Sequence, residues 1–110
     1  MSAPVVHHVK VKSVSPSKGI AGSLVTLELT GMPKNLNELR LTECGVGNQL
    51  DVMKIDSFNM FHENDVVTAH LKIPNNAAAR NNAQFYITFI HQDNSWYEVY
   101  HRAEYTIVID

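Results

Sequence analysis

Apolar and polar residues alternate along most of this chain, so that hydrophobic side chains recur at every second position. Near the N-terminus, Val9 and Val11 alternate with Lys10 and Lys12. A period of two places successive side chains on opposite faces of an extended strand, with one face toward a core. The pattern therefore predicts strands at residues 5–14, 24–29, 38–43, 50–55 and 67–73.

Three segments interrupt this alternation. Residues 15–19 read Ser-Pro-Ser-Lys-Gly, which is typical of a turn. Residues 56–65 are the least regular stretch, although their apolar side chains indicate partial burial. Residues 75–82 contain a short alanine run after Pro74 that is too short to hold a helix alone, so we expect a loop with one helical turn.

The last two predicted strands form a hairpin whose register follows from the apolar positions. From Trp96 onward the odd-numbered residues form the core face: Tyr97, Val99, His101, Ala103, Tyr105, Ile107 and Ile109. For Phe89 to face the same core, the loop must contain an odd number of residues. Residues 92–94 suit a three-residue turn, with Asn94 in the left-handed conformation. We expect the final strand to keep this parity to its end, with His101 as a hydrogen-bonded inner histidine.

This register fixes the cross-strand neighbours on both faces of the hairpin. The inner pairs are Phe89–Tyr97, Ile87–Val99 and Phe85–His101, and the outer pairs are Ile90–Trp96, Thr88–Glu98 and Tyr86–Tyr100. Neighbours of this kind have Cβ atoms about 5 Å apart. The hairpin therefore gathers Tyr86, Ile90, Trp96 and Tyr100 on a sheet face that points to solvent.

The number and spacing of the predicted strands indicate an all-β fold. About seven short strands at intervals of about 8–12 residues predict an antiparallel β-sandwich. The chain has 110 residues, which is the length of one such domain covering residues 1–110. The only cysteine, Cys44, cannot form an internal disulfide, so packing must hold the sheets together.

Charge and hydropathy restrict the partners and the compartment. The net charge is −2, whereas a nucleic-acid binder usually has a concentrated basic face, so nucleic acid is not the expected partner. No apolar run approaches the roughly 20 residues that span a bilayer, so we expect no membrane insertion. The absence of a signal peptide and of disulfides favours the cytoplasm. An extracellular domain excised from a longer protein is the alternative.

Residue types that carry catalysis or metal binding are present but not grouped. The six histidines lack a His-x-His pair or partner cysteines, so we expect no metal site. Cys44 has no helix start beside it to activate the thiol, and it is interpreted as a small buried hydrophobe. No phosphate-binding loop or nucleophile motif occurs. The sequence therefore predicts a protein that is not an enzyme and needs no cofactor.

Residues 11–31 resemble the opening of IPT/TIG domains, an immunoglobulin-like module. The shared features are an apolar strand, Ser15-Pro16, two nearby glycines (Gly19 and Gly22), an apolar-Thr-apolar strand and the closing Gly31. Residues 65–74 and 85–109 are similar to later strands of that family. The chain departs from the pattern at Met32-Pro33 and along residues 51–65. The resemblance implies an immunoglobulin-like sandwich of seven to eight antiparallel strands.

The same resemblance implies several non-catalytic roles. Domains of this kind occur in cell-surface receptors, in transcription factors as dimerisation or DNA-contacting units, and beside polysaccharide-acting enzymes. The family supplies no catalytic residues, and a shared fold does not choose among these roles.

The outer face of the final hairpin is the candidate binding site. Clustered exposed aromatic residues mark interaction surfaces, and Trp and Tyr dominate interface hot spots. We expect binding of a protein partner or a second copy through six residues: Tyr86, Ile90, Trp96, Glu98, Tyr100 and Arg102. Glu98, Arg102 and His70 are the expected polar rim. Carbohydrate stacking on Trp96 and Tyr100 is the alternative, with nearby amides such as Asn75 and Asn76 as hydrogen-bonding groups.

Overall fold

The computed structural model describes residues 5–48 and 51–108, with the side chains of residues 100–104 left out. Apart from one short 3-10 turn, η1 (Leu36–Glu38), the regular elements of this part of the chain are strands. They are β1 (Val6–Ser15), β2 (Lys18–Ile20), β3 (Leu24–Thr30), β4 (Leu39–Asn48), β5 (Asp51–Lys54), β6 (Phe58–Glu63), β7 (Val66–Lys72), β8 (Arg80–His91) and β9 (Trp96–Val108). The predicted all-β class is confirmed.

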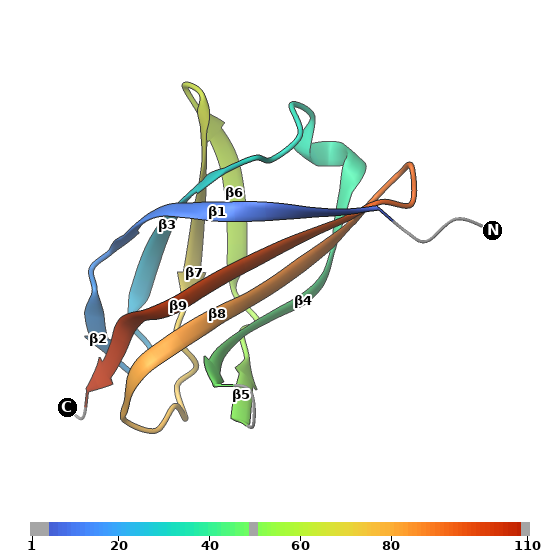
Figure 1. Ribbon diagram of the computed structural model, residues 1–110. Helices are drawn as coiled ribbons and strands as arrows, with labels where there is room; N and C mark the ends of the chain where they lie inside the picture. The colour runs from blue at the N-terminus through green and yellow to red at the C-terminus, as the bar shows by residue number, and fades with distance from the viewer. Residues whose placement is uncertain (1–4, 49–50, 109–110) are drawn as a thin grey trace.

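The strands follow one continuous hydrogen-bonded order, β5-β4-β8-β9-β1-β3-β7-β6, and β2 also pairs with β9 (Figure 1). The long strand β1 belongs to both halves of this order. Its first residues pair with β9 from Val6 to Val9, and its later residues pair with β3 from Lys10 to Ser15. The order has two ends, β5 and β6.

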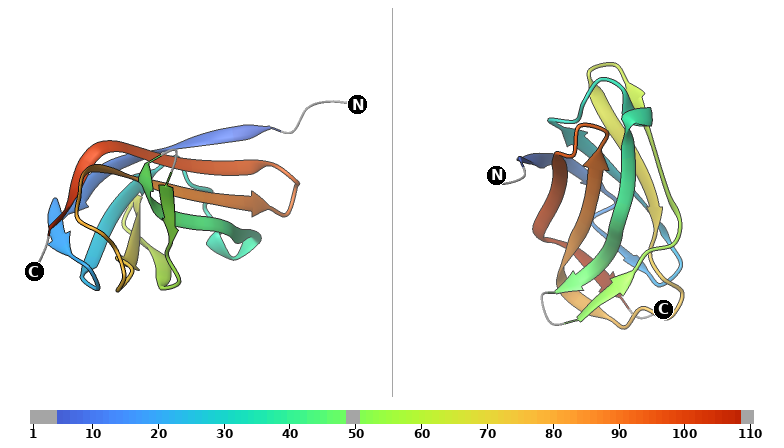
Figure 2. Two further views of the ribbon diagram at one scale, coloured as in Figure 1. Left: turned by 90° about the horizontal axis from the view of Figure 1, so that it is seen from below. Right: turned by 90° about the vertical axis from the view of Figure 1, so that its right-hand side faces the viewer.

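The two halves of this order pack face to face across one core. Figure 2 shows β4, β8 and β9 in one layer and β3, β7 and β6 in the other. Phe58 of β6 contacts Phe89 of β8 with ring centroids 5.9 Å apart, although these strands are not hydrogen-bonded neighbours. The core is filled by alternate residues of the central strands: Val25, Leu27, Leu29, Val67, Ala69, Leu71, Phe85, Ile87, Phe89, Val99, Tyr105 and Ile107.

The strands differ from the expected ones in number and direction. Nine are found in the described residues, because β2 lies in the predicted turn and β6 lies in the stretch interpreted as irregular. The pairing is not antiparallel throughout, since β1 and β2 both run parallel to β9. A segment as short as β2 carries no readable alternation, and its position depends on β9, some 90 residues later.

The segment 75–82 contains no helical turn. The amide of Ala77 donates to the carbonyl of Pro74 at 3.1 Å, which closes a β-turn, and β8 begins at Arg80. The Arg80 guanidinium donates to the Asp51 carbonyl at 2.9 Å and pairs with its carboxylate at 2.5 Å. These contacts stabilise an extended backbone at Arg80. A single helical turn would have been stabilised only by the helix propensity of its alanines, which is not sufficient for so short a segment.

The hairpin of β8 and β9 has the predicted register. The structure contains all six predicted pairs, from Phe85–His101 to Ile90–Trp96. The amide of His91 donates to the carbonyl of Ser95 at 2.8 Å, so the loop is the expected three residues, and Asn94 has φ 70°. The pattern of alternation was therefore sufficient to place each residue of this hairpin on its face.

Beyond Phe85 the pairing shifts, which the sequence did not predict. Ala83 lies opposite Tyr105, so three residues of β9 face a single residue of β8 in this interval. The shift amounts to two residues and therefore keeps parity, and Tyr105 and Ile107 remain buried as expected. The side chains of His101 and Ala103 lie outside the described residues, as does Ile109.

The three-residue turn is held by side-chain contacts on both sides. The Asp93 carboxylate accepts hydrogen bonds from the amide of Ser95 at 2.8 Å and from its hydroxyl. The His91 ring lies between two carboxylates, with Nε2 2.9 Å from Glu38 and Nδ1 3.0 Å from Asp93. These contacts join the β8–β9 turn to η1 in the connection between β3 and β4.

The Asp93 contacts predict an acid-dependent loss of stability. Hydrogen bonds from the Ser95 side chain and backbone lower the pKa of Asp93 from 3.8 to about 2. A carboxyl whose pKa falls on folding stabilises the fold above its unfolded pKa, and this contribution is lost as the pH falls from about 4 toward 2. We expect Asp93→Asn to lose less stability than wild type over this range, measured by urea unfolding at both ends. Identical pH dependence in the two proteins would contradict this role of Asp93.

Tyr105 carries a buried hydroxyl in the core. Its side chain is fully buried, and among the described residues this hydroxyl is the buried side-chain group without a hydrogen-bond partner. It packs against Gly19, where an added Cβ would lie 2.5 Å from the hydroxyl oxygen. Gly19 therefore permits the backbone of β2 to approach the Tyr105 ring closely.

The unpaired hydroxyl predicts that Tyr105→Phe is tolerated. Burying an unpaired polar group costs free energy, so its removal should leave the free energy of unfolding unchanged or raise it by up to about 1 kcal/mol. Chemical denaturation of the two proteins measures this difference. A clear loss of stability in Tyr105→Phe would show that the hydroxyl does form a stabilising hydrogen bond.

Candidate functional site

The candidate site is the outer face of the layer formed by β4, β8, β9 and β1. Phe85, Ile87 and Phe89 point inward and are almost fully buried, so the intervening residues of β8 point outward. The ladders align these residues in rows across the strands. One row runs Arg40, Ile90, Trp96, Val6, and the next runs Glu43, Thr88, Glu98, His8. A third row places Gly45 beside Tyr86 and Tyr100.

Those predicted site residues whose side chains the structure describes lie on this face. Tyr86, Ile90, Trp96 and Glu98 are all partly exposed. The backbone of Tyr100 pairs with Tyr86, which brings the third row together as expected. The side chains of Tyr100 and Arg102 lie outside the described residues.

Two apolar members of this surface were not predicted from the sequence. Val6 of β1 is 41% exposed and lies beside Trp96, because the two strands run in parallel register. Val52 of β5 is 40% exposed and lies over Gly45, where an added Cβ would meet the Val52 Cγ1 at 2.6 Å. We call the set Val6, Val52, Tyr86, Ile90 and Trp96 the outer patch. In the sequence, a glycine inside a strand, here Gly45, indicates that another segment can approach the backbone closely. It does not indicate that this segment contains Val52.

The polar surroundings of the outer patch also differ from those expected. His70 is not part of them, because it lies on β7 in the other layer. There it is hydrogen-bonded to Thr26 at 3.0 Å and contacts the Phe61 ring. The polar residues beside the outer patch are instead Arg40 and Glu43 of β4 and His8 of β1, which are all exposed. Strand order decides these neighbours, and alternation within a single strand contains no information about it.

The charged groups around the outer patch are available to a ligand. Among the described residues, neither Arg40 nor Glu98 forms an ion pair, and the Trp96 indole N–H donates no hydrogen bond. Thr42 donates to the carbonyl and the hydroxyl of Thr88, both at 3.1 Å, which fixes the polar row between Ile90 and Tyr86. The face thus presents apolar rows separated by one polar row, with charges of both signs.

The one thiol is unsuited to nucleophilic chemistry. Cys44 is buried as expected, and burial together with the neighbouring Glu43 carboxylate raises the pKa of the thiol to about 12. The thiolate is the nucleophile, so this group is unreactive near neutral pH. Within residues 5–48 and 51–108, no three His, Cys, Asp or Glu side chains are grouped so that they could hold a metal ion.

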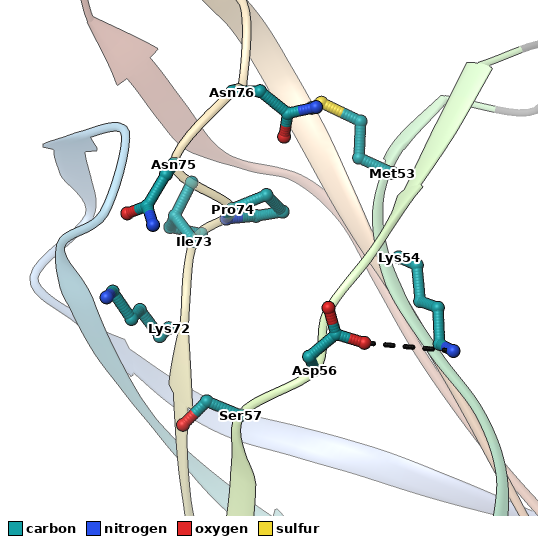
Figure 3. A pocket seen from close by; sticks show the side chains of 9 residues that line it. All are labelled: Met53, Lys54, Asp56, Ser57, Lys72, Ile73, Pro74, Asn75 and Asn76. Carbon is teal, nitrogen blue, oxygen red and sulfur yellow. Dashed lines mark ion pairs between the residues drawn. The ribbon is translucent and has the colours of Figure 1, made fainter.

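An open groove of about 610 Å³ lies at one end of the described part of the molecule, and its lining begins at Met53, the residue after Val52 of the outer patch. It lies between the β5–β6 connection and the segment after β7 (Figure 3). Figure 3 shows that its polar groups diverge, since Lys72 points away and Asp56 turns toward Lys54, 3.7 Å away. No set of groups converges on one ligand atom there. We therefore regard the outer patch as the candidate site.

Comparison with known proteins gives no assignment. No protein-family model matches the chain, and no curated protein sequence matches it either. In the part of the chain that the structure describes, no helix is long and apolar enough to cross a bilayer.

Proposed function

We propose that this chain is an immunoglobulin-like β-sandwich of the IPT/TIG type that acts as a recognition domain. It has no catalytic role, and it binds a protein partner through the outer patch. The strand order supports the fold assignment. Immunoglobulin-like domains pair strands A-B-E-D in one sheet and G-F-C-C′ in the other. The layers here run β1-β3-β7-β6 and β9-β8-β4-β5, which is the same order of chain segments.

The observation that carries the function is an apolar outer face on a layer whose inner face already forms the core. A half-buried sheet normally alternates apolar residues inward with polar residues outward. Strand β8 instead places Tyr86 and Ile90 outward between the buried Phe85, Ile87 and Phe89. Packing of the core does not require these outward side chains.

The size and composition of the outer patch favour a protein partner. The five adjacent strands from β5 to β1 and five residues along β8 span about 19 by 13 Å, which is the size of an interface centre, not of a whole interface of about 800 Å² per partner. Protein interfaces combine such an apolar centre with a polar rim. Arg40, Glu43 and Glu98 supply charges of both signs around it.

Carbohydrate binding is the competing function. Sugar rings stack on aromatic faces, whereas three of the five patch residues here are aliphatic: Val6, Val52 and Ile90. The exposed carboxylate of Glu43 and that of Glu98, which lie in one row on either side of Thr88, also disfavour a nucleic-acid backbone. Aliphatic surface of this kind is buried most effectively against another protein.

Affinity capture followed by reconstitution tests the proposed function. Immobilised wild type and Trp96→Ala are incubated with a lysate of the source cells, and proteins retained by wild type alone are purified and mixed with the chain as a binary complex. We expect at least one stable binary complex, or a dimer of the chain, that Trp96→Ala disrupts. Titration of a polysaccharide panel is the second arm. Saccharide binding by a monomer that is abolished by Trp96→Ala would overturn the proposal.

A further inference from the structure

Strand β6 forms a free edge at one end of the hydrogen-bonded strand order. The hydrogen-bonded order ends at β5 on one side and at β6 on the other. An edge strand presents unpaired N–H and C=O groups, which form a template for another strand. Folded proteins usually protect such edges with short strands, lysine, proline, bulges or covering side chains.

The two edges are protected to very different extents. Strand β5 has only four residues, contains Lys54, and has the Asp51 carbonyl occupied by the Arg80 guanidinium at 2.9 Å. Strand β6 has six residues, Phe58–Glu63, with no lysine and no proline. Its register with β7 runs from Phe58↔Leu71 to Glu63↔Val66 without a bulge. Of the two ends of this order, β6 is therefore the one with a long and regular edge. The ring Nε2 of His62 lies 2.7 Å from the Lys34 carbonyl, so the β3–β4 connection contacts the side chain at the end of this strand.

The pairing with β7 shows which backbone groups of β6 are free. The amide of Lys72 donates to the carbonyl of Ser57 at 3.2 Å. In an antiparallel ladder the N–H and C=O of one residue point to the same neighbour, and the direction alternates along the strand. The odd-numbered residues of β6 therefore face β7. Phe58, Met60 and His62 direct their N–H and C=O groups to the open side.

We propose that β6 pairs with β6 of a second copy of this chain, antiparallel and about a two-fold axis at Phe61. Side chains on one face remain on that face in such a pair, so residues of equal parity lie opposite each other. Phe61 then faces Phe61 of the second copy. Met60 and His62 of each copy exchange backbone hydrogen bonds with His62 and Met60 of the other, which completes the open edge.

The chemistry of the strand favours a second copy over an unrelated peptide. In this register Glu63 lies opposite Asn59 of the second copy on both sides of the axis, so the carboxylate meets an amide donor. Glu63 has one long hydrogen bond of 3.5 Å from Thr68 and is otherwise exposed. Asp65 lies in the turn between β6 and β7, outside this register, so no acid on β6 faces an acid. Phe61, 39% exposed, gains an aromatic partner at the axis.

Charge reversal at the axis tests this pairing in the full chain. Wild type, Phe61→Lys, Phe61→Glu and an equimolar mixture of the two variants are compared by sedimentation velocity over a concentration series. Leu24→Lys is the matched control, since Leu24 is 68% exposed on the interior strand β3. Thermal unfolding of each protein verifies that it is folded.

We expect wild type and Leu24→Lys to form a dimer with a dissociation constant of about 10–100 μM, because a six-residue edge is a small interface. Each Phe61 variant alone should dimerise at least about 10-fold more weakly, since like charges then meet at the axis. The mixture should recover a dimer. A wild type that remains monomeric, a dimer insensitive to both variants, or a mixture without recovery would each overturn the proposal. The dimer does not involve the outer patch, so Trp96→Ala should leave it intact.

Discussion

Truncation of Phe89 to alanine is expected to lower the free energy of unfolding by about 3–5 kcal/mol, the range for removing a buried aromatic ring. Phe89 is 1% exposed and contacts Phe58 of the opposite layer. Its removal leaves a cavity at the place where β8 and β6 pack together without backbone hydrogen bonds. Such a loss is a large part of the 5–15 kcal/mol by which domains are stable. Urea unfolding followed by circular dichroism measures it.

Ile90→Ala is the matched control, because the neighbouring residue lies on the opposite face of the same strand. Ile90 points outward and is partly exposed, so we expect a loss below about 1.5 kcal/mol. Equal losses in the two variants would contradict the assignment of an inner and an outer face to β8.

The second large effect is expected on binding at Trp96. Trp96 lies at the centre of the apolar row, between Ile90 and Val6, and its indole N–H donates to no described residue. Truncation of a central aromatic residue in an interface typically costs about 2 kcal/mol or more. We therefore expect Trp96→Ala to weaken the reconstituted binary complex at least about 30-fold. Isothermal titration calorimetry measures the dissociation constant.

Two variants separate a local effect from a general one. Val108→Ala removes an exposed apolar side chain from the same strand, 37% exposed and away from the outer patch, and should leave affinity unchanged. Trp96→Phe keeps an aromatic ring but loses the indole N–H and part of the apolar area, so we expect an affinity between those of wild type and Trp96→Ala. Undiminished affinity in Trp96→Ala would refute the role of the patch.

The hairpin was predictable because every step depended on local alternation. The side-chain period of two decides the face of each residue, and the requirement that Phe89 and Tyr97 share one core decides the loop length. The irregularity between Ala83 and Phe85 did not disturb the prediction, since a shift of two residues keeps parity. A second shift, of one residue, lies between Ala83 and Arg80, which pairs with Ile107; its extra residue is in β8, so Ile107 of β9 stays buried.

The surroundings of the outer patch could not be predicted in the same way. Val6 becomes a neighbour of Trp96 only because β1 runs parallel to β9, and Arg40 becomes a neighbour of Ile90 only because β4 pairs with β8. These contacts join residues about 90 and 50 positions apart. His70 was assigned to the rim for the same reason, because its alternation gave its face but not its layer.

The central claim is that a partner protein covers the outer patch, and the fluorescence of Trp96 tests it most directly. The chain contains a single tryptophan, so all indole emission comes from the centre of the patch. In the free chain the partly exposed Trp96 should be quenched by acrylamide. In a complex with a partner that lacks tryptophan, we expect the emission to shift to shorter wavelength and the quenching to fall. Unchanged emission and quenching in a saturated complex would contradict the claim.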